Sequence, residues 1–331
     1  MALVTLACCL LAVRRSSWII AVLGLVGGFA TPLLLSSGHD RPIGLFGYVL
    51  LLDLGLLWIG TRRRWPSLGL LSLVGTLLLQ ALWVGAHMGP ERLFLGLAIL
   101  AVFAVLYLFW SRFAEERGPS LVWQLSRIGA IFFPFAFAVY FAARVELGAH
   151  LYPVALLLAL LCAAAGWIAR QQRAYSIGVG AAAATIAVVG VWLLQHSLTA
   201  ALAWEVVAVA VGLAVIFHVF VELEPQPPGK DGPALAAMLA VGGLFLLLLF
   251  AAFAARVPVW PWVVAWAAFC DLLYRHAKFP GRGALQLAGA IVIGFGLTAL
   301  HLSPATLLPA PALFLGLLVA APLALHGLAL H

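Results

Sequence analysis

Long hydrophobic runs separated by short polar loops occupy almost the whole chain. After a short run at 2–13, they lie at 17–35, 43–60, 66–86, 91–111, 121–143, 150–169, 174–194, 198–221, 234–254, 257–274, 283–301 and 305–327. Most have about the 20 residues that a helix needs to cross a bilayer. Runs such as 244–250 do not alternate hydrophobic and polar positions as membrane β-barrel strands do. The pattern predicts an all-α fold, a polytopic transmembrane helical bundle of about 12–13 spans.

The composition agrees with a protein whose solvent is lipid. Of the 331 residues, 65% are hydrophobic and 9% are charged, whereas soluble domains have roughly 45–50% apolar and 25% charged residues. The formal net charge is +7, but the basic residues lie in the short loops. They therefore indicate topology and contact with membrane lipids, and we expect no nucleic acid partner.

The loop charges also predict an orientation. When successive loops are assigned to alternate sides, thirteen Lys and Arg residues fall on one side and four on the other, namely Arg41, Arg92, Arg144 and Arg256. The positive-inside rule places the thirteen-residue side in the cytoplasm. The C-terminus is then cytoplasmic and the N-terminus outside.

The longest polar insertion divides the hydrophobic runs into two groups. A proline-rich cytoplasmic linker is predicted at 222–233, between N-terminal spans at 1–221 and C-terminal spans at 234–331. Inspection of the sequence reveals no internal repeat that would support the inverted-repeat architecture of many transporters.

Two acidic residues lie more than five residues from either end of a hydrophobic run. Asp53 lies about 15 Å into its span, and Glu205 lies seven residues into another, on a face with the small residues Ala201, Ala208 and Gly212. Acids at such positions mark proton or cation sites, or they hydrogen-bond to a neighbouring helix as packing contacts. The small residues predict a buried, tightly packed Glu205.

The second span carries an element that interrupts a helix. Gly27, Gly28, Thr31 and Pro32 are the residues involved. Pro32 lacks a backbone donor and clashes with the preceding turn. We expect either a kinked helix or a break that exposes backbone groups to a ligand.

Several polar residues are predicted at the outer ends of spans. This outer-face cluster comprises His39, Asp40, His87, His150, His196 and His301. None of the histidines has the spacing of a known ligand motif, so no metal site is predicted. The chain also lacks a Walker loop, a dinucleotide fingerprint and a GxSxG motif, and we expect no cofactor.

One stretch resembles a known family. The run 23–36, followed by Leu45–Tyr48 and by 50–55, resembles the bacterial multi-pass membrane proteins catalogued as domain of unknown function 2339, and Arg62–Trp65 and Val74–Thr76 continue the likeness. The close match covers about residues 10–85. The resemblance implies a bacterial inner-membrane protein and brings no established activity. Family members are usually longer, so this chain is expected to begin part-way through the family's bundle.

Three functions are compatible with these features. The first is transport or permeation of a small solute or ion that uses Asp53 and Glu205. The second is a membrane-embedded enzyme or envelope-assembly factor that acts on lipid or glycan at the outer-face cluster. The third is a non-catalytic structural membrane component.

Overall fold

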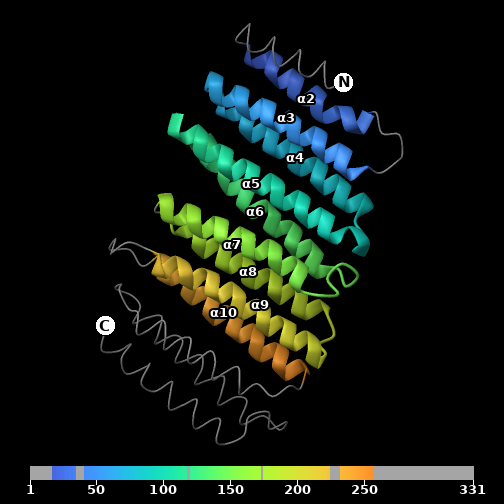
Figure 1. Cartoon of the computed structure of the whole chain (residues 1–331), viewed down its shortest axis with the longest axis vertical. Coiled ribbons are helices and arrows are strands. Elements are labelled where there is room, and N and C mark those ends of the chain that lie inside the picture. Colours follow the sequence, from blue (N-terminus) through green and yellow to red (C-terminus); the bar gives the residue numbers. More distant parts are fainter. Residues whose placement is uncertain (1–16, 35–40, 118–119, 173, 224–231, 256–331) are drawn as a thin grey trace, which may run out of the picture. The chain divides into compact units, whose positions relative to one another are not determined.

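Helices make up the part of the chain that the structure describes. The computed structural model describes residues 17–34, 41–117, 120–172, 174–223 and 232–255. Its elements are α2 (Trp18–Leu34), α3 (Pro42–Arg63), α4 (Pro66–His87), the 3₁₀ helix η1 (Pro90–Arg92), α5 (Leu93–Arg117), α6 (Leu121–Ala143), α7 (Tyr152–Gln172), α8 (Ser176–Gln195), α9 (Ala200–Glu222) and α10 (Gly232–Ala255) (Figure 1). Each predicted span from 17–35 to 234–254 coincides with one helix to within a few residues.

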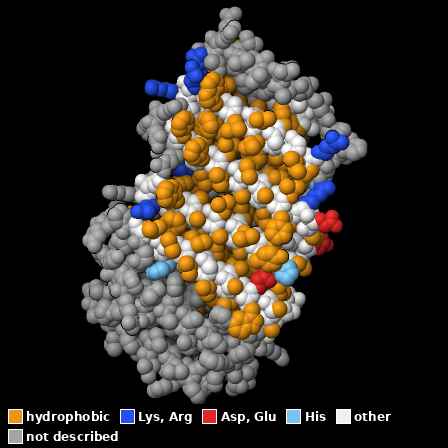
Figure 2. All heavy atoms as spheres, in the orientation of Figure 1, with side chains coloured by type: hydrophobic (Ala, Val, Ile, Leu, Met, Phe, Trp, Pro, Cys, Tyr) orange, Lys and Arg blue, Asp and Glu red, His pale blue; other side chains and the backbone are white. Residues whose placement is uncertain are grey.

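The predicted transmembrane architecture is confirmed for this part of the chain. Seven of these segments are long and apolar enough to cross a membrane: Pro42–Arg63, Pro66–His87, Pro90–Trp110, Leu121–Ala143, Tyr152–Gln171, Ser176–Gln195 and Ala200–Phe220. Trp18–Pro32 and Leu239–Ala252 are shorter apolar stretches. Large hydrophobic side chains are exposed on the described surface, as Figure 2 shows. The predicted run at 2–13 and the last three predicted spans lie outside the described residues.

The helices belong to two compact units that divide within α6, at Met1–Pro134 and Phe135–His331. In the first unit α3 packs on α4, and α2 and α5 both pack on these two helices. In the second unit α7 packs on α8 and α9, and α10 packs on the same two helices. The boundary predicted at the 222–233 linker stays a prediction.

Of the two alternatives expected for the second span, the structure does not have the break, because α2 continues through Pro32 to Leu34. Pro32 cannot donate to the carbonyl of Gly28, four residues earlier. The hydroxyl of Tyr48 in α3 donates to that carbonyl instead, at 3.1 Å. The Thr31 hydroxyl also donates to the Gly27 carbonyl at 2.7 Å. The helix therefore continues because a neighbouring helix supplies the hydrogen bond that proline removes.

The α3–α4 and α7–α8 hairpins correspond to each other at a constant offset of 109 residues, the separation of Trp58 from Trp167. The residues of the first hairpin that recur unchanged are Leu51, Leu52, Trp58, Ile59, Arg64, Ser67, Gly69, Thr76, Trp83 and His87. Most other positions differ, which explains why the correspondence is hard to see in the sequence alone.

The backbone of the two turns confirms this alignment. The Trp65 N–H donates to the Gly60 carbonyl at 2.7 Å, and the Ala174 N–H donates to the Ala169 carbonyl at 3.0 Å. These donors and acceptors are equivalent at the same offset.

The same positions are also buried in both hairpins. Equivalent buried pairs are Leu52 and Leu161, Leu56 and Ala165, Ile59 and Ile168, Leu68 and Ile177, Leu73 and Ala182, Leu79 and Val188, and Trp83 and Trp192. The chain therefore contains a repeated helical hairpin, which corrects the expectation from the sequence.

Candidate functional site: a buried acid and its hydroxyl ligands

The acid cluster of the first unit is centred on Asp53, midway along α3. The Asp53 side chain is fully buried. An ionised carboxylate at the centre of a membrane helix costs at least about 2.5–3.5 kcal/mol on insertion scales. Hydrogen bonds from neighbouring helices therefore decide whether this position is tolerated.

Helix α4 supplies two of these hydrogen bonds. The Ser72 hydroxyl donates to Asp53 Oδ1 at 2.5 Å, and the Thr76 hydroxyl donates to Oδ2 at 2.6 Å. Residues four apart lie on one face of a helix, so α4 presents both hydroxyls to the carboxyl group together. Both side chains are buried.

Helix α5 extends the cluster. The Tyr107 hydroxyl lies 2.7 Å from Ser72 Oγ and is also buried. Because Ser72 uses its one proton toward Asp53, Tyr107 is the donor in this contact. Three helices thus converge on one carboxyl group. We define the acid cluster as Asp53, Ser72, Thr76 and Tyr107.

The polar face of α4 continues one turn further, to Gln80. Its side chain is 2% exposed, and its amide nitrogen has no hydrogen-bond partner. A buried amide donor without a partner costs about 1–3 kcal/mol. Side chains on a helix lean toward its N-terminus, which directs Gln80 toward the turn of Thr76.

The equivalent positions of the second hairpin are almost apolar. Cys162, Ala181 and Val189 stand where the first hairpin has Asp53, Ser72 and Gln80, and only Thr185 is retained from Thr76. The Thr185 hydroxyl donates to the Ala181 carbonyl at 2.8 Å and lies 3.1 Å from Cys162 Sγ. A hydroxyl at this position can therefore turn to its own helix when no carboxylate is present.

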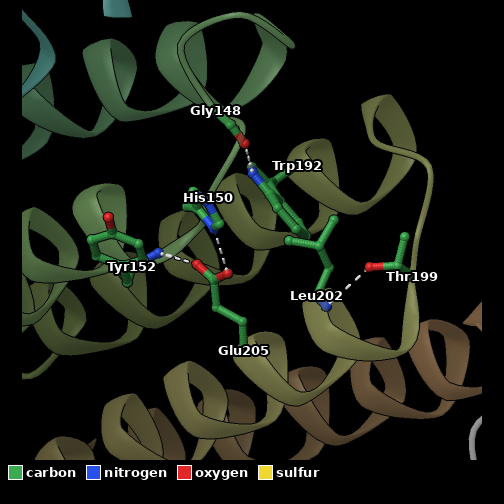
Figure 3. Close-up of polar contacts among 7 residues, drawn as sticks. All are labelled: Gly148, His150, Tyr152, Trp192, Thr199, Leu202 and Glu205. Carbon is green, nitrogen blue, oxygen red and sulfur yellow. Dashed lines mark hydrogen bonds and ion pairs between the residues drawn. The ribbon is translucent and has the colours of Figure 1, made fainter. Parts of the chain in front are cut away.

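Glu205 lies near the start of α9, as its place in the predicted span implies, but its side chain is not fully buried. Figure 3 shows its two oxygens accepting from the Tyr152 N–H at 2.8 Å and contacting His150 Nδ1 at 3.1 Å. Its side chain is 16% exposed. The small residues on its face, including Ala208 and Gly212, are exposed. The prediction of a tightly packed acid was wrong because a helix N-terminus, with its unpaired N–H groups, attracts this carboxylate.

The structure describes three members of the outer-face cluster, His87, His150 and His196. His150 contacts Glu205. His196 ends α8, where its Nδ1 lies 2.8 Å from the Trp192 carbonyl and its ring stacks on that indole. His87 lies exposed at the end of α4. His39, Asp40 and His301 lie outside the described residues. Among the residues that the structure describes, no three His, Cys, Asp or Glu side chains come together as a metal site would require.

A comparison of the sequence with protein families gives one decisive match. The family described as "Predicted membrane protein (DUF2339)" matches residues 1–331. The chain belongs to the DUF2339 family. This confirms the resemblance seen at residues 10–85 and extends it over the whole sequence. No curated protein and no solved structure matches this DUF2339 chain. It is thus a multi-pass membrane protein whose site must be interpreted from its own geometry.

Sequence reasoning about this DUF2339 protein identified Asp53 but missed its partners. Ser72, Thr76 and Tyr107 resemble the many small or aromatic polar residues that occur in membrane helices. The available signal was the i, i+4, i+8 spacing of Ser72, Thr76 and Gln80 in the hairpin partner of the Asp53 helix.

Proposed function

We propose that this DUF2339 protein transports a cation through its first unit, and that Asp53 takes up and releases that cation. The proposal narrows the transport or permeation role expected from the sequence to one acid. Glu205 is left out, because its carboxylate is engaged at the start of α7.

The repeated hairpin is the observation that carries this proposal. The second hairpin has the same turn hydrogen bonds and buried positions, yet it packs with Cys162 and Ala181 where the first has Asp53 and Ser72. The architecture therefore does not require a buried acid. Because such an acid is costly in a membrane, its presence in one hairpin alone supports a role in binding.

The hydroxyls around Asp53 suit a carboxyl group that changes its charge. A hydroxyl can donate to an ionised carboxylate or accept from a protonated one. Thr76 can also turn to a carbonyl of its own helix, as Thr185 does at 2.8 Å. Uptake and release at Asp53 would then leave no buried polar atom of the cluster unsatisfied.

Access to Asp53 requires a conformational change, because the acid cluster is buried on all sides. In the proposed mechanism the described conformation is an occluded one, and α3, α4 and α5 separate at one end to admit the cation. Transporters commonly open such a site alternately to the two sides of the membrane.

The complete burial of Asp53 also favours a second candidate, a structural membrane component. A carboxyl group with both oxygens hydrogen-bonded between helices is what a packing contact would provide. In that case substitution of Asp53 would lower the stability of the bundle and change no flux. The outer-face cluster gives no comparable support to an enzyme.

The test is cation flux in liposomes that contain the purified full chain. Asp53→Asn should reduce proton or sodium flux at least about tenfold, which corresponds to about 1.4 kcal/mol. The double variant Asp53→Cys with Ser72→Ala, which copies two residues of the second hairpin, should also reduce this flux. Thr185→Val is the matched control and should leave flux unchanged. Equal flux in wild type and Asp53→Asn, above that of empty liposomes, would remove Asp53 from the mechanism.

We also propose that the protein lies in the bacterial inner membrane with the α3–α4 turn in the cytoplasm. The excess of Lys and Arg on the side of Arg62–Arg64 supports this orientation. In a variant without the four native cysteines, an impermeant maleimide added to intact cells should label Gly89→Cys and not Trp65→Cys. The reverse labelling would contradict the orientation.

A further inference from the structure

The unpartnered amide of Gln80 indicates that the polar site extends beyond the four residues of the acid cluster. Gln80 is buried, and its nitrogen has no hydrogen-bond partner. It follows Thr76 by one helical turn and leans toward it. Its counterpart in the second hairpin is Val189, which is also buried. The protein therefore tolerates an unsatisfied polar group at a position where an aliphatic side chain packs well.

We propose that the acid cluster and Gln80 together bind one dehydrated monovalent cation of the size of Na⁺. This inference rests on the proposed transport function and names the cation. The Asp53 carboxylate supplies the negative charge. The hydroxyl oxygens of Ser72, Thr76 and Tyr107 and the amide oxygen of Gln80 supply neutral ligands.

The ligand types define the charge and hardness of the cation. All the available ligand atoms are oxygens, which suit hard cations and not soft transition metals. One carboxylate neutralises one positive charge. A divalent ion would leave an uncompensated charge among buried helices, which is expensive in a membrane. A proton alone needs a single acceptor, so it leaves the convergence of three helices and Gln80 unexplained.

Small rearrangements would convert the described arrangement into a binding site. The hydroxyl protons of Ser72 and Thr76 now point at the carboxylate. When a cation takes their place, they can turn to carbonyls four residues earlier, as Thr61 and Thr185 do at 2.8 Å. A half-turn of the Gln80 amide would replace its unpartnered nitrogen by an oxygen.

The oxygens must also separate slightly. The paired oxygen atoms of the cluster lie 2.5–2.7 Å apart, as hydrogen-bonded oxygens do. A cation such as Ca²⁺, which has nearly the radius of Na⁺, holds each oxygen at about 2.3–2.6 Å. Its ligand oxygens are then farther from one another than hydrogen-bonded ones. To hold the cation once it has entered, α3, α4 and α5 must therefore stand apart by a further fraction of an ångström.

The first experiment measures binding without transport. Purified full-length protein in detergent is heated in NaCl, KCl or choline chloride at constant ionic strength. We expect a saturable rise in Tm with NaCl only, and a proton released for each Na⁺ bound when Asp53 starts protonated. Sodium affinity should therefore fall as the pH falls. Tyr107 is the other titratable side chain in the cluster.

Variants assign the ligands. Asp53→Asn should abolish the response to NaCl. Gln80→Leu should weaken sodium affinity about tenfold, the effect of losing about 1.4 kcal/mol of binding, while the Tm without sodium stays the same or rises. Thr185→Val, in the second hairpin, should leave the sodium response unchanged.

The outcomes separate this inference from the proposed function. A sodium-specific rise in Tm that requires Asp53 and Gln80 supports it. An equal response to all three salts, or a sodium response that Gln80→Leu leaves intact, overturns it. If Asp53-dependent proton flux persists in liposomes without any sodium response, transport stands and the sodium site falls. If Asp53→Asn changes neither flux nor Tm, both proposals fail.

Discussion

The two hairpins of this protein have the same frame and different interiors. Both turn with equivalent backbone hydrogen bonds, and both bury a tryptophan at the same position, Trp83 and Trp192. Of the two hairpins, only α3–α4 holds an acid, and helix α4 presents to it Ser72, which has no counterpart hydroxyl in α8. The difference teaches that small apolar side chains are enough for the two helices of such a hairpin to pack together. The presence of Asp53 and Ser72 in the first hairpin must therefore be explained by something other than the packing of its two helices.

The largest expected effect comes from placing the acid in the wrong hairpin. Cys162→Asp should lower the free energy of unfolding by at least about 2.5–3.5 kcal/mol, because Thr185 is the only hydroxyl that the second hairpin offers there. Adding Ala181→Ser, which copies Ser72, should recover about 1 kcal/mol through one hydrogen bond. Denaturant titration in detergent micelles measures both changes.

The control for this transplant is Cys162→Ser, which adds a hydroxyl and no charge. It should cost less than the acid at the same position. If Cys162→Asp is as stable as wild type, charge is not what distinguishes the two interiors.

The next largest effect concerns the glycines that face a neighbouring helix. A Cβ added at Gly69 would lie 2.3 Å from the ring of Trp123, whereas one added at Gly178 would lie 3.5 Å from the Cβ of Ala236. Gly69→Ala should therefore destabilise the protein by about 1–3 kcal/mol through overpacking. Gly178→Ala should be neutral or stabilising by up to about 1 kcal/mol, since alanine favours helix. Thermal unfolding of the two variants checks this contrast, and equal Tm changes would contradict it.

The spans could be predicted from the sequence because a bilayer leaves the backbone few choices. Hydropathy located α3 and α9 to within a few residues. It could not show that α2 continues through Pro32, since the hydrogen bond that permits this comes from Tyr48, in another helix. Local sequence contains no information about such a partner.

Of the residues in the candidate site, only Asp53 could be predicted from the sequence. Asp53 is conspicuous because acids are rare in membrane spans. Its partners depend on which face of α4 meets α3, and that is set by packing over the whole hairpin. For Glu205 the sequence misled in another way. The small residues beside it predicted a buried side chain, but its carboxylate is instead held by the Tyr152 N–H at the start of α7.

A smaller contrast is expected between the two threonines that the hairpins share. Thr76→Val would remove the hydrogen bond that Oδ2 of Asp53 accepts from Thr76, which should cost about 1–3 kcal/mol. Thr185→Val should cost about 0.5–1.5 kcal/mol, because its acceptor, the Ala181 carbonyl, lies within a helix and retains its backbone bond. Valine matches threonine in shape, so unfolding free energies of the pair isolate the hydroxyl. Equal costs would mean that Thr76 serves packing and not the acid.

The smallest expected effect tests how the two hairpins begin. Helix α3 starts with Pro42, which has no backbone N–H to satisfy. Helix α7 starts with Tyr152, whose N–H donates to Glu205 of α9 at 2.8 Å. Glu205 thus acts as a capping residue supplied by another helix, and a lost cap costs about 1 kcal/mol.

Two substitutions separate the hydrogen bond of this cap from its charge. Glu205→Ala should lower the unfolding free energy by about 1 kcal/mol. Glu205→Gln should cost about half as much, because its amide oxygen still accepts from Tyr152 while the interaction of the charge with the helix end is lost. Glu146→Gln, at an exposed acid of the same unit, should change nothing measurable. If the alanine and glutamine variants are equally unstable, the charge of Glu205 stabilises the start of α7 and its hydrogen bond contributes little.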